Sequence, residues 1–178
     1  SKLSKMSDAN FKKAVLYMWK SVQTGNHSNI KTLLTPELPV DTPLTDGGMT
    51  GLHIAWSRGD LDAAKIFLEN EADIMKEDKL GRTALHFAAS IGTNLDLIET
   101  LIEMGAKVNA KSHGGETPLM KAIAFDNADA AKLLLDKGAD PEIENAMNRN
   151  SYSFAKASRN EDILSALGID ATGDANMG

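Results

Sequence analysis

The sequence contains no cysteine, and no apolar run in it approaches the ~20 residues that a transmembrane helix needs. Without cysteine, disulfide bridges, thiolate zinc sites and cysteine nucleophiles are excluded. The opening residues, Ser-Lys-Leu-Ser-Lys-Met, lack the apolar core of a secretory signal peptide. We therefore expect no membrane insertion and an intracellular protein, cytoplasmic in the simplest case, with nuclear, ciliary and organellar complexes left open.

Motifs that carry chemistry are also missing. No glycine-rich phosphate loop, His-Glu-x-x-His pair, Gly-x-Ser-x-Gly elbow or set of metal ligands occurs. Of the four histidines, His27 and His113 stand alone in polar segments that we interpret as loops. We predict no catalytic residue, no metal site and no cofactor, so the protein is not expected to be an enzyme.

Acidic residues outnumber basic ones, 25 to 19, which gives a formal net charge of −6. Residues 1–24 hold five lysines against one aspartate, so the rest of the chain carries a net charge of −10. An acidic body repels the phosphates of nucleic acid, which is therefore not an expected partner. The 178 residues, of which 42% are apolar, fit one globular domain.

The clearest positive signal is an internal repeat of 33 or 34 residues. Thr50, Thr83 and Thr117 hold equivalent places in three segments of the form Gly-x-Thr-x-Leu, and His53 and His86 complete a Thr-x-Leu-His opening in the first two. Downstream, each unit has an Asn or Asp that suits the N-cap of a second helix, with an aspartate two positions later. These N-cap residues are Asp60, Asn94, Asn127 and Asn160.

This pattern resembles the ankyrin repeat family, whose units open with Gly-x-Thr-Pro-Leu-His-x-Ala and close with Gly-Ala-Asp. The resemblance covers residues 17–168 and implies an all-α solenoid of helix-turn-helix units with short β-turn fingers. It implies about five helix pairs, of which the first and last are degenerate caps. The chain then divides into a flexible basic arm at residues 1–7, a repeat domain at 8–168 and a disordered tail at 169–178.

In this family the histidine of the opening bonds to the threonine and to the backbone of the neighbouring loop. The resemblance therefore implies a structural and not a catalytic role for the motif residues. These are Thr50, His53, Thr83, His86 and Thr117.

Three places depart from the repeat. Glu71 stands where a unit would end in a left-handed glycine, so we expect the preceding asparagine or an altered turn to take that conformation. Trp56 stands where the other units have Ala89, Ile123 and Lys156, so it must either protrude or displace its neighbours. The segment 35–48 holds three of the five prolines, and we interpret it as a stiff, irregular first finger.

A further helix is predicted to begin after Ser7. Its apolar residues recur every three or four positions and should cover the first repeat. They are Phe11, Val15, Met18, Trp19 and Val22. Lys12, Lys13 and Lys20 would lie on the outer face, either as solvated surface or as a docking site for an acidic partner.

In such solenoids the finger tips and the exposed side of the first helices form a concave face, where large apolar side chains need an explanation. Aromatic, Met and Arg residues fall at these positions here, and these types are enriched in binding hot spots. The predicted partner-binding stripe consists of Met49, Trp56, Arg58, Leu80, Arg82, Ile91, Phe125, Met147 and Arg149. The alternative for Ile91 and Phe125 is packing into a neighbouring unit.

Two functions remain open at this point. The first is a non-catalytic adaptor or inhibitor that binds a protein partner through the concave face. The second is a constitutive structural subunit of a large multiprotein assembly, in which the basic arm and the polar tail order on assembly.

Overall fold

The computed structural model describes residues 6–92 and 95–170. Within these ranges the chain forms ten helices and no strand beyond an isolated bridge between Thr35 and Leu38, in the proline-rich segment 35–48. The helices are α1 (Asp8–Thr24), α2 (His27–Leu33), α3 (Gly51–Ser57), α4 (Leu61–Glu69), α5 (Ala84–Ile91), α6 (Leu95–Glu103), α7 (Pro118–Ala124), α8 (Ala128–Asp136), α9 (Ser151–Ser158) and α10 (Glu161–Ala166).

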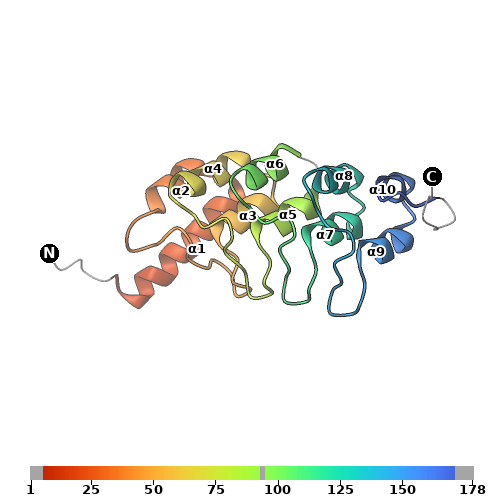
Figure 1. Ribbon diagram of the computed structural model, residues 1–178. Helices are drawn as coiled ribbons and strands as arrows, with labels where there is room; N and C mark the ends of the chain where they lie inside the picture. The colour runs from red at the N-terminus through yellow and green to blue at the C-terminus, as the bar shows by residue number, and fades with distance from the viewer. Residues whose placement is uncertain (1–5, 93–94, 171–178) are drawn as a thin grey trace.

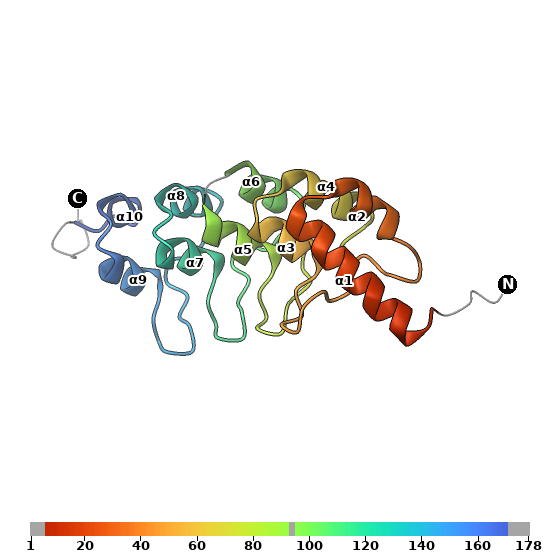
Figure 2. The ribbon, with the colours of Figure 1, turned by 180° about the vertical axis from the view of Figure 1, so that it is seen from behind.

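The helices lie in two rows. The first row consists of α1, α3, α5, α7 and α9, and the second of α2, α4, α6, α8 and α10 (Figure 1). The loops that join one pair to the next project from the first row, on the side away from the second row, as fingers. The view from behind shows the same order, with the long α1 at the N-terminal end (Figure 2). The predicted all-α solenoid of helix pairs is confirmed.

Small residues bring neighbouring first-row helices close together. Alanines occupy the same position in four successive units, and each is at most 3% exposed. They are Ala55, Ala88, Ala122 and Ala155. Three positions earlier, Leu52, Leu85 and Leu119 are fully buried and fill the space between the two rows. Burial of these apolar residues between adjacent units is the main force that holds the stack together.

Polar side chains begin the second-row helices. Asp60 accepts a hydrogen bond from an amide in the first turn of α4, and Asn160 does the same at α10, as predicted. Asn127 does not cap α8: its Nδ2 instead donates to two carbonyl oxygens at the end of α5, at 2.6 and 3.1 Å. This side chain therefore ties two units together. Asn94 lies outside the described residues.

A left-handed residue follows each second-row helix from α4 to α10. After α6 it is Gly105, at φ 96°, whereas after α4 it is Glu71, at φ 64°. Asn70 keeps φ −98°, so the expectation that it or an altered turn relieves Glu71 is wrong. The amide of Ala72 still bonds back to its helix as that of Ala106 does, so the turn is unaltered and Glu71 itself carries the strain.

Trp56 has no exposed surface. Of the two alternatives that the sequence leaves for Trp56, protrusion is therefore wrong, and so is its place in the predicted partner-binding stripe. Its counterparts Ala89 and Ile123 are equally buried, whereas Lys156 in the last helix pair is exposed. Because no helix pair follows α9 and α10 in the described residues, this pattern indicates that the position faces the next unit. The indole Nε1 is also buried and has no hydrogen-bond partner in the described part of the chain.

A second large core residue, Phe67, fills the space beside Gly51. A Cβ atom added to Gly51 would lie 2.2 Å from the Phe67 ring. Two units later the same two positions hold Pro118 and Leu134. Compared with that unit, the first full repeat has a smaller residue on its first helix and a larger one on its second helix.

The two ends of the repeat domain follow the sequence pattern. Ser7 caps α1, where its side chain accepts from the amide of Asn10 at 3.4 Å. Met18 and Val22 are buried, and the other apolar residues of the α1 stripe pack partly buried against the same core. Ile169, which the sequence analysis assigns to the tail, is also buried. Residues 1–5 of the arm and 171–178 of the tail lie outside the described residues.

Candidate functional site: the concave face

Four fingers border the first row of helices. Each one closes on the side chain of its first residue, whose oxygen accepts a hydrogen bond from the amide four positions later, at 2.9 to 3.2 Å. The fingers are Thr45–Thr50, Asp78–Thr83, Ser112–Thr117 and Asn145–Asn150. Together with the exposed side of the first-row helices they make up the concave face.

Backbone hydrogen bonds join each finger to the next. The amide of Lys79 donates to the carbonyl oxygen of Gly47 at 2.9 Å, and the amide of His113 donates to Leu80 at 2.8 Å. Between the last two fingers, the amide of Ala146 donates to Gly114 at 2.9 Å. The fingers therefore form one connected margin, and they do not move as separate loops.

Two histidines fix the fingers to the helices. The amide of Thr50 donates to Nδ1 of His53 at 3.0 Å, and Nε2 of His53 donates to the carbonyl oxygen of Lys76 at 2.8 Å. One unit later His86 makes the same contacts, with the amide of Thr83 at 3.1 Å and a carbonyl oxygen of the third finger at 3.0 Å. These are the bonds that the resemblance implies for the histidine of the motif, to the threonine and to the backbone of the neighbouring loop.

The protonation state of these histidines follows from their contacts. Burial lowers the pKa of both His53 and His86 below 6.5, because the charged ring would lose its hydration. In addition, Nδ1 accepts an amide hydrogen and so must be unprotonated. Both rings are therefore neutral, with the proton on Nε2. In the third unit, Met120 replaces the histidine and Thr117 caps α7 by accepting from the Met120 amide.

Two arginines of the concave face lie on phenyl rings. Cζ of Arg82 is 4.6 Å from the ring centroid of Phe87, and Cζ of Arg149 is 4.9 Å from that of Phe154. In both cases the arginine is the last finger residue before the N-cap, and the phenylalanine is five positions further, in the first-row helix. Each ring holds its guanidinium group at the junction between finger and helix.

The same two positions hold other kinds of side chain in the other units. In the third, Lys121 and Glu116 form an ion pair at 2.5 Å. In the first, Met49 is half-buried against the core and Ile54 is fully buried. The series therefore runs from two apolar residues through an arginine on a ring and an ion pair to a second arginine on a ring.

Asp78 holds Arg82 from the finger side. Its Oδ2 accepts from Nε and Nη2 of Arg82, at 2.8 and 2.6 Å, while its Oδ1 accepts from the amides of Leu80 and Arg82, both at 2.9 Å. Burial by itself would raise the pKa of Asp78, but the hydrogen bonds and charge of Arg82 outweigh it and the pKa is lowered. Arg82 is therefore partly used to stabilise its own finger.

Comparison with known families agrees with this geometry. The family described as ankyrin repeats (3 copies) matches three overlapping segments, residues 17–112, 52–145 and 92–172. The chain belongs to the ankyrin repeat family. Ankyrin repeats bind protein partners, so the concave face is the candidate functional site of this ankyrin repeat chain.

Individual relatives are longer ankyrin repeat proteins. Probable 26S proteasome regulatory subunit p28 of Saccharomyces cerevisiae is 37% identical over 122 residues, 67% of this chain and 53% of the relative. The Caenorhabditis elegans ankyrin repeat and LEM domain-containing protein 1 homolog is 44% identical over 77 residues, 42% of this chain and 11% of the relative. The Mus musculus B-cell lymphoma 3 protein homolog is 33% identical over 118 residues, 66% of this chain and 26% of the relative. The chain thus spans about half of the yeast relative and less of the others.

The predicted partner-binding residues divide into three groups on this ankyrin scaffold. The exposed group consists of Leu80, Phe125 and Met147, at 58%, 60% and 72% exposure, together with Arg58 and Arg149. Arg82 and Ile91 are half-buried, and so is Met49, which packs against the core and does not lie at a finger tip as expected. Trp56 is the one member of the predicted stripe with no exposed surface.

The rings beneath the arginines were not predicted as part of the site. Phe87 and Phe154 are half-buried, and in the sequence they look like ordinary apolar helix residues. The signal that reveals them is register: Arg82 and Phe87 recur as Arg149 and Phe154, at the same two places of the repeat. A residue-by-residue search for exposed apolar side chains misses such pairs.

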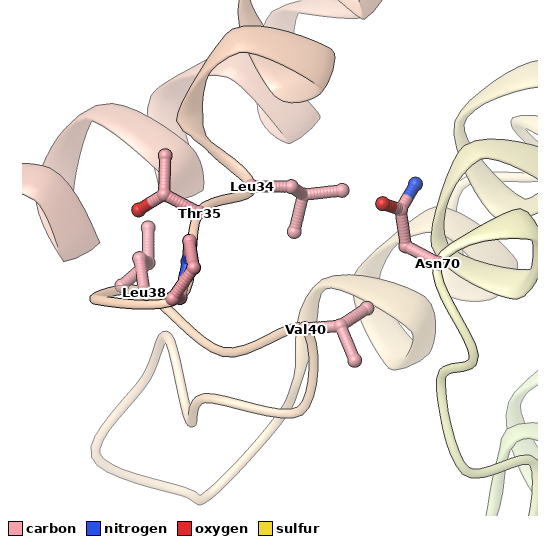
Figure 3. Close-up of a pocket in the computed structure, with 6 residues that line it drawn as sticks. Leu34, Thr35, Leu38, Val40 and Asn70 are labelled. Atoms are coloured by element: carbon pink, nitrogen blue, oxygen red, sulfur yellow. The ribbon is translucent and has the colours of Figure 1, made fainter.

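Other candidate sites offer little chemistry. In the described ranges no group of three or more His, Cys, Asp or Glu side chains is placed to hold a metal ion. A surface pocket after α2 is lined by Leu34, Leu38, Val40 and Asn70 among others, and it carries no titratable side chain (Figure 3). None of the described helices is long and apolar enough to cross a membrane.

The prediction that His27 is an isolated loop residue is wrong. It is the first residue of α2, and its Nε2 lies 2.9 and 3.0 Å from the two carboxylate oxygens of Asp60. The contact joins the start of α2 to the N-cap of α4. His113 does lie in a finger, with its Nε2 4.0 Å from Glu77.

Proposed function

We propose that the chain is a non-catalytic protein-binding module, an adaptor or inhibitor, whose concave face binds a protein partner. The observation that supports this most directly is the pair of arginines on phenyl rings at equivalent positions of two units, Arg82 on Phe87 and Arg149 on Phe154. Arginine and aromatic side chains are the types that most often dominate binding energy. Side chains that are already held in place lose less conformational entropy when a partner binds.

Two of the exposed apolar residues lie in the same fingers as these arginines. Leu80 and Met147 are at the tips of the second and fourth fingers, and Phe125 follows the last turn of α7. A large apolar side chain exposed to water in the free protein gains free energy when a partner covers it. The concave face therefore combines held cationic groups with uncovered apolar ones, as binding hot spots do.

Alanine substitutions on the two sides of the solenoid test the proposal. Leu80→Ala, Phe125→Ala and Met147→Ala should each weaken binding of the partner protein, with the central residues costing ~2 kcal/mol or more. Lys65→Ala and Lys132→Ala, at exposed positions of α4 and α8, are the controls and should leave binding unchanged. The measurement is a titration with the partner isolated from the native source, with circular dichroism on every variant. Loss of binding in the controls alone would contradict the proposal.

Arg82→Ala is a poor test of binding. It would leave the buried carboxylate of Asp78 without its cation, and an unpaired buried charge destabilises the fold. Any loss of binding in this variant would mix a lost contact with a disrupted finger. In the residues that the structure describes, Arg149 has no such carboxylate partner, so it is the better arginine to replace.

A second candidate function is a constitutive subunit of a large assembly. The observation that favours it is the similarity to a yeast protein whose name is probable 26S proteasome regulatory subunit p28. Size fractionation of extracts from the native source separates the two: an adaptor elutes partly as a free monomer, and a constitutive subunit elutes only with a large complex. The same relative supports a location inside the cell, in cytoplasm or nucleus.

A further inference from the structure

The second and fourth fingers begin with side chains that differ in one terminal atom, and this atom decides whether the arginine of the finger has an acceptor within the chain. In the second finger, Oδ1 of Asp78 accepts hydrogen bonds from the backbone amides of Leu80 and Arg82, and Oδ2 accepts one from the side chain of Arg82. In the fourth finger Asn145 takes the place of the aspartate, and its Oδ1 accepts the amides of Met147 and Arg149 in the same way, at 2.9 and 3.0 Å. The other terminal atom of the Asn145 side chain is the amide nitrogen Nδ2, which donates hydrogen bonds and cannot accept one from arginine.

This difference leaves the charge of Arg149 uncompensated. Within the described part of the chain no carboxylate lies within ion-pair distance of its guanidinium group, whose one polar side-chain contact is the sulfur of Met147, at 3.7 Å from Nη2. The group lies over the ring of Phe154, with Cζ 4.9 Å from the ring centroid. The edge that carries the N–H groups remains available, in the geometry that binds a carboxylate through two parallel hydrogen bonds.

The distribution of charge over the two helix rows favours the same kind of ligand. Within their helical bounds, the first-row helices carry five lysines against one aspartate. The second-row helices carry nine aspartates and glutamates against three lysines. Among the helices, the first row is therefore basic and the second row is acidic. An acidic ligand would meet less repulsion at the first-row helices than at the second-row helices.

We propose that Arg149, held on Phe154, binds a carboxylate of an acidic segment of the partner protein, and that Asn145 keeps Arg149 free for this contact. The inference rests on the proposed function, because it names the chemistry of a ligand for the same concave face. Met147, which is exposed two residues before Arg149 in the same finger, offers an apolar contact beside the carboxylate.

The decisive variant is Asn145→Asp, which keeps the arginine but supplies the missing acceptor. An aspartate at position 145 preserves both hydrogen bonds to the finger amides and should pair with Arg149 as Asp78 pairs with Arg82. The fold should be at least as stable as the wild type. Binding of an acidic ligand should fall about tenfold, as it should in Arg149→Gln, because one charge-assisted contact is lost.

The probe is a displayed library of random 15-residue peptides, selected on the full immobilised chain. The selected peptides should be enriched in Asp and Glu, and they should bind Asn145→Asp and Arg149→Gln about tenfold more weakly. In the Arg149→Gln background, adding Asn145→Asp should have little further effect, which separates the engagement of Arg149 from the mere addition of a negative charge. Lys65→Gln, which removes a charge from α4, should bind the peptides normally.

Three results would overturn the inference. One is that the selected peptides depend on Leu80 or Phe125 but are neutral or basic, or bind Asn145→Asp as tightly as the wild type. This result would leave the proposed function intact. Another is a single-stranded RNA of 20 nucleotides that binds more tightly than any acidic peptide and depends on Arg149. The last is that no selected peptide depends on any residue of the concave face, which would remove the proposed function as well.

Discussion

His53 donates from Nε2 to the carbonyl oxygen of Lys76 at 2.8 Å, across 23 residues of chain. This bond joins the start of α3 to the loop that leads into the second finger. His53→Ala should therefore leave buried backbone groups without partners and lower the free energy of unfolding by about 1 to 3 kcal/mol, and His86→Ala should do the same. Urea denaturation followed by circular dichroism measures the effect. Either variant at full wild-type stability would show that the ring is not structural.

The same histidines should make the fold sensitive to mild acid. Their pKa is lower in the folded chain than the 6.5 of an unfolded one, so below pH 6.5 the unfolded state takes up more protons. Stability should be complete above pH 6.5 and decline as the pH falls toward 5, since protonation of Nδ1 breaks the bond from the Thr50 or Thr83 amide. Unfolding midpoints at pH 7.5 and 5 should differ less in a His53→Gln, His86→Gln double variant than in the wild type.

Glu71 should be replaceable by glycine with a gain in stability. Its φ of 64° lies in the left-handed region, where a side chain is strained and glycine is not. Glu71→Gly should raise the free energy of unfolding by up to about 1 kcal/mol. The reverse change Gly105→Glu is the matched control: a Cβ there meets no atom within 4 Å, so the expected destabilisation comes from backbone strain alone. Loss of stability in Glu71→Gly would mean that the carboxylate stabilises the turn.

Gly51 and Phe67 should behave as a coupled pair. Gly51→Ala places a methyl group 2.2 Å from the Phe67 ring and should destabilise the fold by about 1 to 3 kcal/mol, as overpacking does. Phe67→Leu removes the ring, so Gly51→Ala should cost much less in that background. A double-mutant cycle from urea denaturation gives the coupling energy. Additive effects of the two changes would show that the ring moves aside freely.

The sequence predicts the helix pairs well because their positions recur at 33 or 34 residues, and recurrence fixes the caps, the alanines and the histidines together. It fails where a residue contacts a neighbouring unit and not its own. Trp56 is buried because its position faces the next helix pair, and Asn127 leaves its own helix to bond the end of α5. Neither contact is visible in the spacing along the chain.

The concave face was predicted in part for the same reason. Exposed residues such as Leu80 and Phe125 stand out in the repeat frame, because large apolar side chains are unexpected there. The arginine and phenylalanine pairs did not stand out, since each ring taken alone fits an ordinary helix. The first finger position holds a carboxylate in Asp78 and an amide in Asn145. Whether this side chain accepts a hydrogen bond from the arginine of its finger can be judged only when the position of the arginine is known.

The bonds between neighbouring fingers also limit which partners can bind. The amides of Lys79, His113 and Ala146 each donate to the finger before them, so the distance between adjacent fingertips is fixed by backbone geometry. A partner that contacts two or more fingers must present its side chains at that same interval. Selectivity of the concave face thus depends on the pitch of the repeat as well as on the side chains that it displays.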